Sequence, residues 1–397
     1  MSETITFMID ETLVGQHDYY EYVNTILTKK SQFYQPYRPS HAVDVSPYEL
    51  IAFYLPQFHP IPLNEAAWGP GFTEWTQITK AQPFFYGHYQ PHLPADLGFY
   101  DLRLVETLRA QAALARNYGV SGFCFYYYWF SGQRLMDGPL EMLHQNKDID
   151  VKYCLMWANE SWSKRWIDEQ EIIIAQRHDP KIDCEFIHSI IPYLEDDRYV
   201  RYQGKPVISI YRQNLMTDRS AIDYWRQACR DAGVGEILIM SVPGYGTIDD
   251  AGLDGVLQFP PSGDIQEFRV KGEDNSSFFN KNFDGYLKNP AICRDRFMRQ
   301  TGSGKPIFRG AFTSFDSSPR FGNLASIYIN SSPDFYGNWL VETIRQSRRD
   351  AANRQAPMTP VFINAWNEWA EGCHLEPDLA FGHAYLEATR AALDSVR

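Results

Sequence analysis

The chain has 397 residues, 44% of them hydrophobic, with a formal net charge of −12 and a sequence pI near 5.3. This acidity disfavours nucleic acid as a partner, because phosphate binding requires clustered lysine and arginine. No stretch approaches the roughly 18 apolar residues of a membrane helix. The acidic start lacks the basic and apolar segments of a signal peptide, so we expect a cytoplasmic protein without a membrane span.

Residues 1–48 show no strong periodicity, and we expect them to form an extension packed on a catalytic domain at 49–397. In that domain, eight short apolar runs rich in Ile, Val, Phe and Tyr are typical of buried strands. The runs are Leu50–Leu55, Gly122–Tyr127, Val151–Met156, Pro206–Tyr211, Glu236–Ser241, Gly255–Phe259, Pro306–Gly310 and Pro360–Ala365.

Helical patterns lie between several of these runs, at residues 101–115, 221–232, 339–351 and 383–396. The first helix is followed by Tyr118-Gly119-Val120, which is typical of the turn from a helix into a parallel strand. Eight such units predict an α/β fold, a (β/α)8 barrel with long loops after its strands. A doubly wound open sheet is the alternative, but the Gly-rich phosphate turn that it favours after the first strand is missing.

The segment after the first strand carries polar side chains that we expect near the barrel mouth. Gln57 and His59 follow the strand directly, and Trp68–Trp75 is too rich in Gly and Pro for a helix. We expect this loop to place Glu74 and Trp75 at the mouth. Asp96 or Asp101 is expected to cap the first helix.

No metal site and no cofactor are expected. His59, His88 and His92 fit no familiar metal spacing, and we expect sugar binding or loop bracing from them. The six cysteines include no C-x-x-C pair and are expected to be reduced thiols.

Aromatic side chains make up 15% of the chain and gather where predicted strands end. Part of this content must fill the core, but aromatic faces also stack on sugar rings, so we expect an aromatic binding cleft. The aromatic residues expected to contact substrate are Tyr126, Tyr128, Trp129, Trp157, Trp162, Trp366 and Trp369. Residues 262–305 and 312–335 are expected to be long loops over the mouth.

Glu368 and Glu371 are the primary catalytic candidates. They follow the eighth apolar run and alternate with Trp366 and Trp369. In a glycosidase one carboxyl protonates the leaving oxygen and the other acts as a base or nucleophile. Their pKa values must differ, so one should lie in a drier place packed by rings. The alternative is that one glutamate caps the last helix or pairs with an arginine.

Asn159 and Glu160 end the third strand and form a second candidate pair, because an amide donates to a sugar hydroxyl and a carboxylate accepts from it. The alternative is an ion pair from Glu160 to Lys164 or Arg165. Asn367, beside Glu368, is expected to bind substrate in the same way.

Several strings resemble the WbsX-type proteins, which are labelled glycosyltransferases of O-antigen and capsule clusters and are similar to the endo-α-mannosidases of glycoside hydrolase family 99. The strings are Gly71–Trp75, Gly87–Pro94, Gly122–Phe130, Trp157–Trp162 and Asn364–Gly372. The resemblance covers about residues 50 to 390. It implies a (β/α)8 barrel, no metal and a retaining mechanism.

In the mannosidases, the first glutamate of an Asn-Glu-Trp-x-Glu-Gly string deprotonates the sugar 2-hydroxyl, which attacks the anomeric carbon to give an epoxide. The second glutamate is the acid and then the base for water. The resemblance therefore implies that Glu368 is the base and Glu371 the acid/base.

We expect a retaining, endo-acting glycoside hydrolase whose partner is a bacterial oligosaccharide or polysaccharide. A glycosyltransferase of surface polysaccharide biosynthesis is the alternative, although no Asp-x-Asp metal motif for a sugar nucleotide is evident. A sugar-binding barrel without catalysis is the third reading, which the intact acids disfavour.

Overall fold

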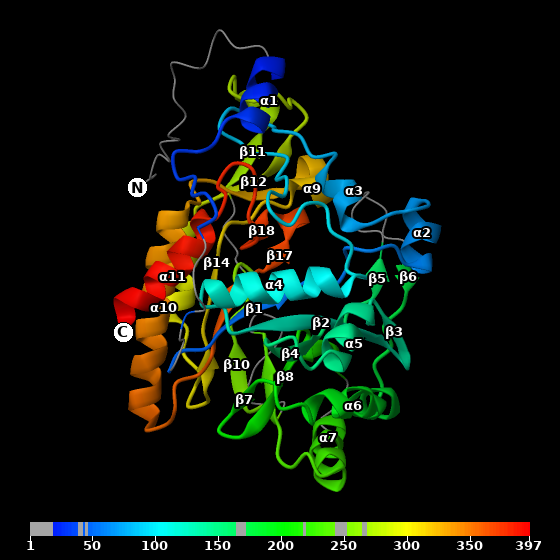
Figure 1. The fold of residues 1–397 in the computed structure, drawn as a ribbon. Coiled ribbons are helices and arrows are strands. Elements are labelled where there is room, and N and C mark those ends of the chain that lie inside the picture. The colour runs from blue at the N-terminus through cyan, green and yellow to red at the C-terminus, as the bar shows by residue number, and fades with distance from the viewer. Residues whose placement is uncertain are drawn as a thin grey trace.

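The structure is a computed structural model that describes residues 19–38, 43, 47–163, 172–216, 220–242, 252–263 and 268–397. Parallel strands form its centre, and helices surround them (Figure 1). The central strands are β1 (Leu50–Tyr54), β2 (Gly122–Phe130), β4 (Lys152–Trp157), β8 (Lys205–Ile210), β9 (Leu238–Ser241), β10 (Gly255–Leu257), β13 (Ile307–Phe308), β14 (Gly310–Phe312) and β16 (Val361–Asn364). Each predicted run coincides with one of these strands, and the seventh run spans β13 and the start of β14.

The sheet closes into a barrel because β1 pairs in parallel with both β2 and β16. The seventh strand is interrupted: β13 pairs with β10, β14 pairs with β16, and Arg309 lies between them. The carbonyl of Arg309 still accepts a hydrogen bond from the Phe362 amide at 2.8 Å. The two pieces therefore act as one strand of an eight-stranded barrel, which confirms the predicted fold.

Helices cover the outside of the barrel, and α10 and α11 lie side by side along one flank (Figure 1). The helices of the barrel are α2 (Pro62–Trp68), α3 (Glu74–Ile78), α4 (Val105–Asn117), α5 (Gly138–Gln145), α6 (Pro180–Leu194), α7 (Ser220–Asp231), α8 (Pro290–Arg299), α9 (Ser318–Phe321), α10 (Pro333–Arg354) and α11 (Ala384–Val396). Within the part of the chain that the structure describes, no helix has the length and apolar character to cross a membrane.

Local sequence signals start and stop the main helices. Ser332 caps α10 by accepting a hydrogen bond from the Phe335 amide, and Pro333 occupies the first turn. After α4 the chain turns at Gly119, whose φ of +85° favours glycine, and a Cβ there would lie 2.3 Å from a methyl of Leu393. This turn directs the chain into β2.

Aromatic rings fill the barrel interior. The ring of Phe53 lies 4.5 Å from Phe259, 5.5 Å from Phe362 and 6.1 Å from Tyr126, measured between centroids. Parallel strands are buried on both faces, which explains why they appear in the sequence as nearly continuous apolar runs. Part of the high aromatic content therefore belongs to the core.

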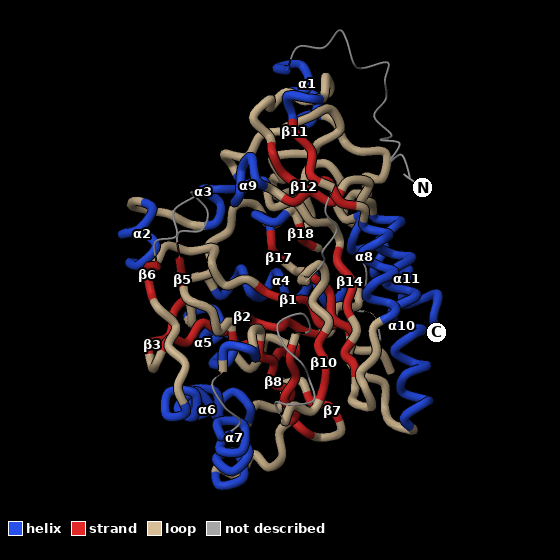
Figure 2. The backbone as a smooth tube through the Cα atoms, turned by 180° about the vertical axis from the view of Figure 1, so that it is seen from behind, coloured by secondary structure: helices blue, strands red, loops and turns tan. Residues whose placement is uncertain are grey.

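A small three-stranded sheet lies apart from the barrel strands and consists of β11 (Arg269–Lys271), β12 (Asp284–Lys288) and β15 (Ser326–Tyr328). The helix α1 (Tyr19–Thr28) lies next to it in both views (Figures 1 and 2). The hydroxyl of Tyr22 accepts a hydrogen bond from the Gly87 amide at 2.6 Å. The described part of the N-terminal extension thus contacts the segment between α3 and α4, which contains Gly87.

Short strands and 3-10 turns lie within the loops between the main elements. The strands are β3 (Gln133–Leu135), β5 (Trp162–Ser163), β6 (Ile172–Ile174), β7 (Arg201–Tyr202), β17 (Asn367–Glu368) and β18 (Cys373–His374). The 3-10 turns are η3 (Gln213–Leu215), η4 (Gly272–Asp274), η5 (Gly322–Leu324) and η6 (Trp369–Glu371).

Three local expectations were wrong. The first long helix starts at Val105 without a side-chain cap, because Asp101 bonds to Arg103 instead. Glu74 begins the short helix α3, since Thr73 and Thr76 form a capping box around its start. The segments 262–305 and 312–335 contain the small sheet, α8 and α9, so they are structured rather than plain loops.

Candidate active site

A cavity of about 460 Å³ opens at the carboxyl ends of the barrel strands, where the chemistry of such barrels takes place. Side chains that follow different strands line it. They include Gln57 after β1, Tyr126 and Tyr128 in β2, Glu160 and Trp162 after β4, Tyr211 after β8, Phe259 after β10, Arg320 in α9, and Glu368 and Glu371 after β16.

Glu368 and Glu371 converge on one guanidinium at the wall of this cavity. The Nη2 of Arg320 donates to Glu368 at 3.0 Å, and its Nη1 donates to Glu371. The Glu368 side chain is 5% exposed and that of Glu371 is 21% exposed. Both acids therefore face the same space, with Glu368 deeper and Glu371 nearer to the opening.

A third carboxylate, Glu74, lies behind this pair. Glu74 is completely buried at the start of α3, and its Oε2 accepts from Arg320 Nη2 at 3.3 Å. A carboxylate at a helix N-terminus is favoured by the helix dipole. Arg320 thus compensates three acids, which places a net negative charge around it when all of them are ionised.

Burial changes the pKa values of two of these carboxyls. Burial raises the pKa of Glu368 to about 8; Arg320 opposes this shift, and Glu371 and Glu74 add to it. Burial also raises the pKa of Glu74, again against the effect of Arg320. The free protein therefore keeps a proton on Glu368 at neutral pH, as a general acid/base pair requires of one of its members.

Aromatic and amide groups line the cavity together with the acids. Gln57 donates to the Tyr128 hydroxyl at 3.0 Å, and the ring of Tyr128 meets Trp162 edge-on at 5.2 Å. Trp162 and Tyr126 also line the cavity. This combination of ring faces and hydrogen-bonding groups suits a sugar ring, which has apolar faces and polar edges.

Glu160 lines the cavity but is ion-paired with Arg212. The alternative partners considered from the sequence, Lys164 and Arg165, lie outside the described residues. Asn159 does not face the cavity: its amide spans the backbone N–H and C=O of Arg212 at 2.8 and 2.9 Å. Asn159 therefore joins the ends of β4 and β8.

Other predicted substrate contacts lie in the core. Trp129 and Trp157 are buried between the sheet and α6, where Trp157 stacks on Phe186 at 4.3 Å. Successive strand residues point to opposite faces. Trp129 follows Tyr128 in β2 and Trp157 follows Met156 in β4, and because Tyr128 and Met156 line the cavity, both tryptophans point outward. The expectation for these two tryptophans was wrong for this reason.

Trp75, Trp366, Asn367 and Trp369 are also placed behind the cavity rather than in its lining. The indole of Trp369 donates to the buried Glu376 at 2.7 Å, and Asn367 bonds both backbone groups of Leu55. These residues position the segment that carries the two acids. They do not form the indole walls expected from the sequence.

The three early histidines separate in the structure. His59 is buried and does not line the cavity, and burial lowers its pKa. His88 bonds to Asp316 at 2.7 Å. His92 lies 2.9 Å from His374, and burial lowers the pKa of His92 to about 4, which leaves it neutral. His88 and His92 line a second cavity.

Arg320, which lines the cavity and bonds all three acids, was not predicted from the sequence. It lies in the string Ser317-Ser318-Pro319-Arg320, which carries only turn signals, and its partners are 246, 48 and 51 residues away. A single basic residue in a polar segment gives no local sign of its role.

Two solved structures share this fold. The GH99 endo-alpha-mannosidase from Bacteroides thetaiotaomicron aligns with a TM-score of 0.50 and 15% identity over 87% of this chain and 97% of that one. A glycoside hydrolase-like protein aligns with a TM-score of 0.52 and 14% identity over 90% of this chain and 97% of that one. At such identities the likeness concerns the fold alone.

The fold is the (β/α)8 barrel of these structures, and acids and aromatic side chains line the cavity at the carboxyl ends of its strands. The chain belongs to the WbsX glycosyltransferase family, whose profile matches residues 50–389, and the resemblance noted from the sequence is confirmed. Two curated relatives, each called uncharacterized protein WxcX and both from Xanthomonas campestris pv. campestris, are 40% identical over 362 residues, or 90% of this chain. The chain spans about half the length, 51%, of these relatives.

Proposed function

We propose that this protein is a retaining, endo-acting glycoside hydrolase that cuts a bacterial surface polysaccharide or oligosaccharide. The observation that carries the proposal is the convergence of Glu368 and Glu371 on Arg320 at a cavity with aromatic walls. Two carboxyls beside a sugar-sized space are the chemical requirement for glycoside hydrolysis. Phe315 and Tyr328 line both this cavity and the second one, which supports a ligand of several sugar units.

The resemblance to the endo-α-mannosidases supplies the roles. The proton that Glu368 holds in the free protein passes to Glu371 when substrate binds. Glu368 can then remove the proton from the sugar 2-hydroxyl, whose oxygen attacks the anomeric carbon while Glu371 protonates the departing oxygen. Glu371 then takes a proton from the water that opens the epoxide, and Glu368 returns its proton to the 2-oxygen, which restores the 2-hydroxyl. The greater exposure of Glu371 supports its contact with the leaving group and with water.

A glycosyltransferase is the second candidate, and the family description favours it. The charges of the cavity disfavour a sugar-nucleotide donor. Its lining contains the acidic residues Glu160, Glu368 and Glu371 and the basic residues Arg320 and Lys288. A diphosphate would meet repulsion from the carboxylates unless a cation accompanied it.

The test is product analysis by mass spectrometry. The protein is incubated in heavy-oxygen water with a panel of bacterial O-antigens and mannans, with and without UDP- and GDP-sugars. Shortened chains with heavy oxygen at new reducing ends, formed without a donor, are the expected result. Chains that grow only when a donor is present would establish the transferase and refute the hydrolase.

The activity should fall as the pH rises above about 8. Glu368 keeps its proton up to this pH, and the mechanism needs one proton in the carboxyl pair. Above it, kcat/KM should decrease about tenfold per pH unit. A profile measured from pH 5 to 10 on the substrate from the screen checks this, and a kcat/KM that stays constant to pH 10 contradicts it.

Trp162 should contribute to substrate binding but little to folding. Replacing it by alanine is expected to raise KM by about three- to tenfold, because an aromatic contact contributes about 0.5–1.5 kcal/mol. Trp157→Ala is the matched control: its indole is fully buried, so the free energy of unfolding should fall by about 3–5 kcal/mol. Enzyme kinetics and chemical unfolding of both variants distinguish substrate binding from folding stability. An unchanged KM in Trp162→Ala contradicts the role of Trp162 in substrate binding.

A further inference from the structure

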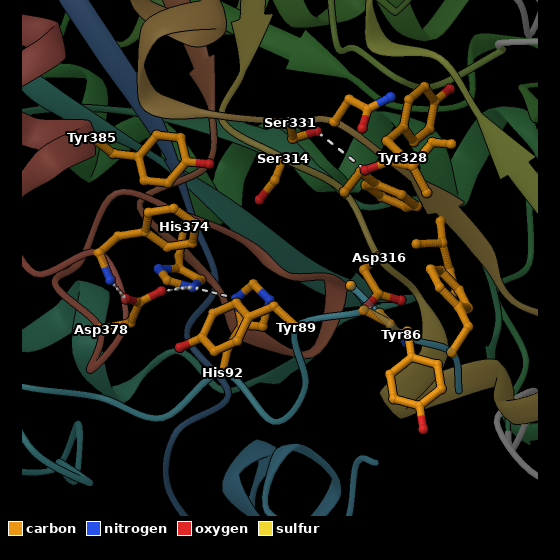
Figure 3. Close-up of a pocket in the computed structure, with 18 residues that line it drawn as sticks. Tyr86, Tyr89, His92, Ser314, Asp316, Tyr328, Ser331, His374, Asp378 and Tyr385 are labelled. Carbon is orange, nitrogen blue, oxygen red and sulfur yellow. Dashed lines mark hydrogen bonds and ion pairs between the residues drawn. The ribbon is translucent and has the colours of Figure 1, made fainter. Parts of the chain in front are cut away.

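A second cavity of about 210 Å³ has three buried side chains with metal-binding atoms in its wall (Figure 3). They are His92, from the segment between α3 and α4, and His374 and Asp378, from the segment between β16 and α11. None of them is part of the acid pair described above. Figure 3 shows the three side chains pointing toward one another.

The distances between their ligand atoms suit binding to one shared metal ion. His92 Nδ1 lies 2.9 Å from His374 Nε2, and His374 Nε2 lies 3.8 Å from the Oδ2 of Asp378. All three ligand atoms lie within 4.8 Å of one another. Ligands bound to one tetrahedral ion at about 2.0–2.2 Å are separated by about 3–4 Å, so only small adjustments are needed.

Neighbouring groups orient these atoms. The Nδ1 of His374 lies 2.9 Å from the carbonyl oxygen of Glu376, which makes Nδ1 the protonated nitrogen and leaves the lone pair on Nε2. One carboxylate oxygen of Asp378 accepts from the Phe381 amide at 2.6 Å, and the other faces His374. This pattern of supporting hydrogen bonds is the one that fixes ligands in metal sites.

The charge of the cluster also favours a cation. Asp378 is 2% exposed, and its Oδ2 lies 3.8 Å from the Nε2 of His374. A buried carboxylate is unfavourable unless hydrogen bonds or a cation compensate it. A divalent ion would compensate this charge and use the nitrogen lone pairs at the same time.

We propose that His92, His374 and Asp378 bind one divalent transition-metal ion of the zinc type, with its fourth position open to the second cavity. Two imidazoles and one carboxylate form a donor set that suits such ions. From the sequence we expected no metal site, because the spacing of His59, His88 and His92 fits no familiar metal motif. His374 lies 282 residues from His92, so the pair cannot be recognised from local spacing.

The ion would connect the first long loop of the barrel to the segment that carries Glu371. A Cβ on Gly372, the residue after Glu371, would lie 3.4 Å from His92 Cε1, and the Glu371 carbonyl accepts from the Asp316 amide at 2.6 Å. His92 is thus packed against the backbone beside this acid. The ion has a positioning role here, and the proposal does not depend on the reaction.

Metal binding is tested directly on the full chain. Wild type, His92→Gln, His374→Gln and Asp378→Asn are stripped with a chelator, equilibrated with Zn²⁺ and dialysed, and their metal content is measured by mass spectrometry. Co²⁺ is used in parallel, because its visible absorption reports a tetrahedral site. His188→Gln is the matched control, since this histidine bonds to the exposed Tyr224 on the outside of the protein. Circular dichroism shows which variants are folded.

Wild type and His188→Gln should retain about one Zn²⁺ per chain and show the Co²⁺ bands, and each ligand variant that folds should lose both. Zn²⁺ should also raise the Tm of wild type but not that of Asp378→Asn, which keeps the shape of the side chain. A wild type that retains no Zn²⁺, or retains as much as Asp378→Asn, overturns the proposal.

Discussion

Replacing Glu371 by glutamine is expected to lower kcat by about 10²–10⁴-fold, because the amide has no proton to give to the leaving oxygen and cannot accept one from water. Glu368→Gln should lose activity to a similar extent, since an amide cannot act as a base. Both substitutions preserve the side-chain shape and leave Arg320 with two other carboxylates. Their effect should therefore appear in turnover rather than in folding. Steady-state kinetics on the substrate from the product screen measure it.

Glu160→Gln is the control for these variants. Glu160 lines the same cavity, but its ion-pair partner is Arg212 rather than Arg320. Its loss should change KM more than kcat. Turnover close to that of wild type in Glu371→Gln would remove the assignment of this residue as the acid/base.

Replacing Arg320 by methionine should lower the free energy of unfolding at pH 8 by about 3–5 kcal/mol, because removing one partner of a buried ion pair leaves the other charge uncompensated. Here three acids lose their cation: Glu74, Glu368 and Glu371. The loss should shrink as the pH falls, since protonation removes the charges that repel one another. Urea unfolding at pH 8 and at pH 5 measures both effects.

Arg320→Lys is the matched variant. It keeps the positive charge but not the planar fork that contacts all three carboxylates, so it should retain more stability than Arg320→Met while losing activity. If Arg320→Met unfolded at the same urea concentration as wild type at pH 8, the guanidinium would not be the group that compensates these acids.

The barrel could be predicted from the sequence because its determinants are local. Parallel strands buried on both faces must be apolar at nearly every position, so each appears as a short run such as Leu50–Leu55. Helix ends carry their own signals, as Gly119 does after α4. The split of the seventh strand at Arg309 was not visible, because its cause is the pairing with two different neighbours.

The predictions of substrate contacts were less accurate, because a residue's place in the chain does not give the direction of its side chain. Tyr126 and Tyr128 line the cavity, whereas Trp129 points outward and is buried between the sheet and α6. The phase of the alternation at a strand end depends on how the sheet curves. An aromatic residue there can serve the core as well as the cavity.

The eight strands and the nearness of Glu368 to Glu371 follow from the sequence, because both depend on residues close together in the chain. What surrounds the two acids depends on contacts between distant segments. Arg320 reaches Glu74 across 246 residues, and His92 reaches His374 across 282. Side chains that far apart meet only when the barrel closes, and burial then sets their charge and partners.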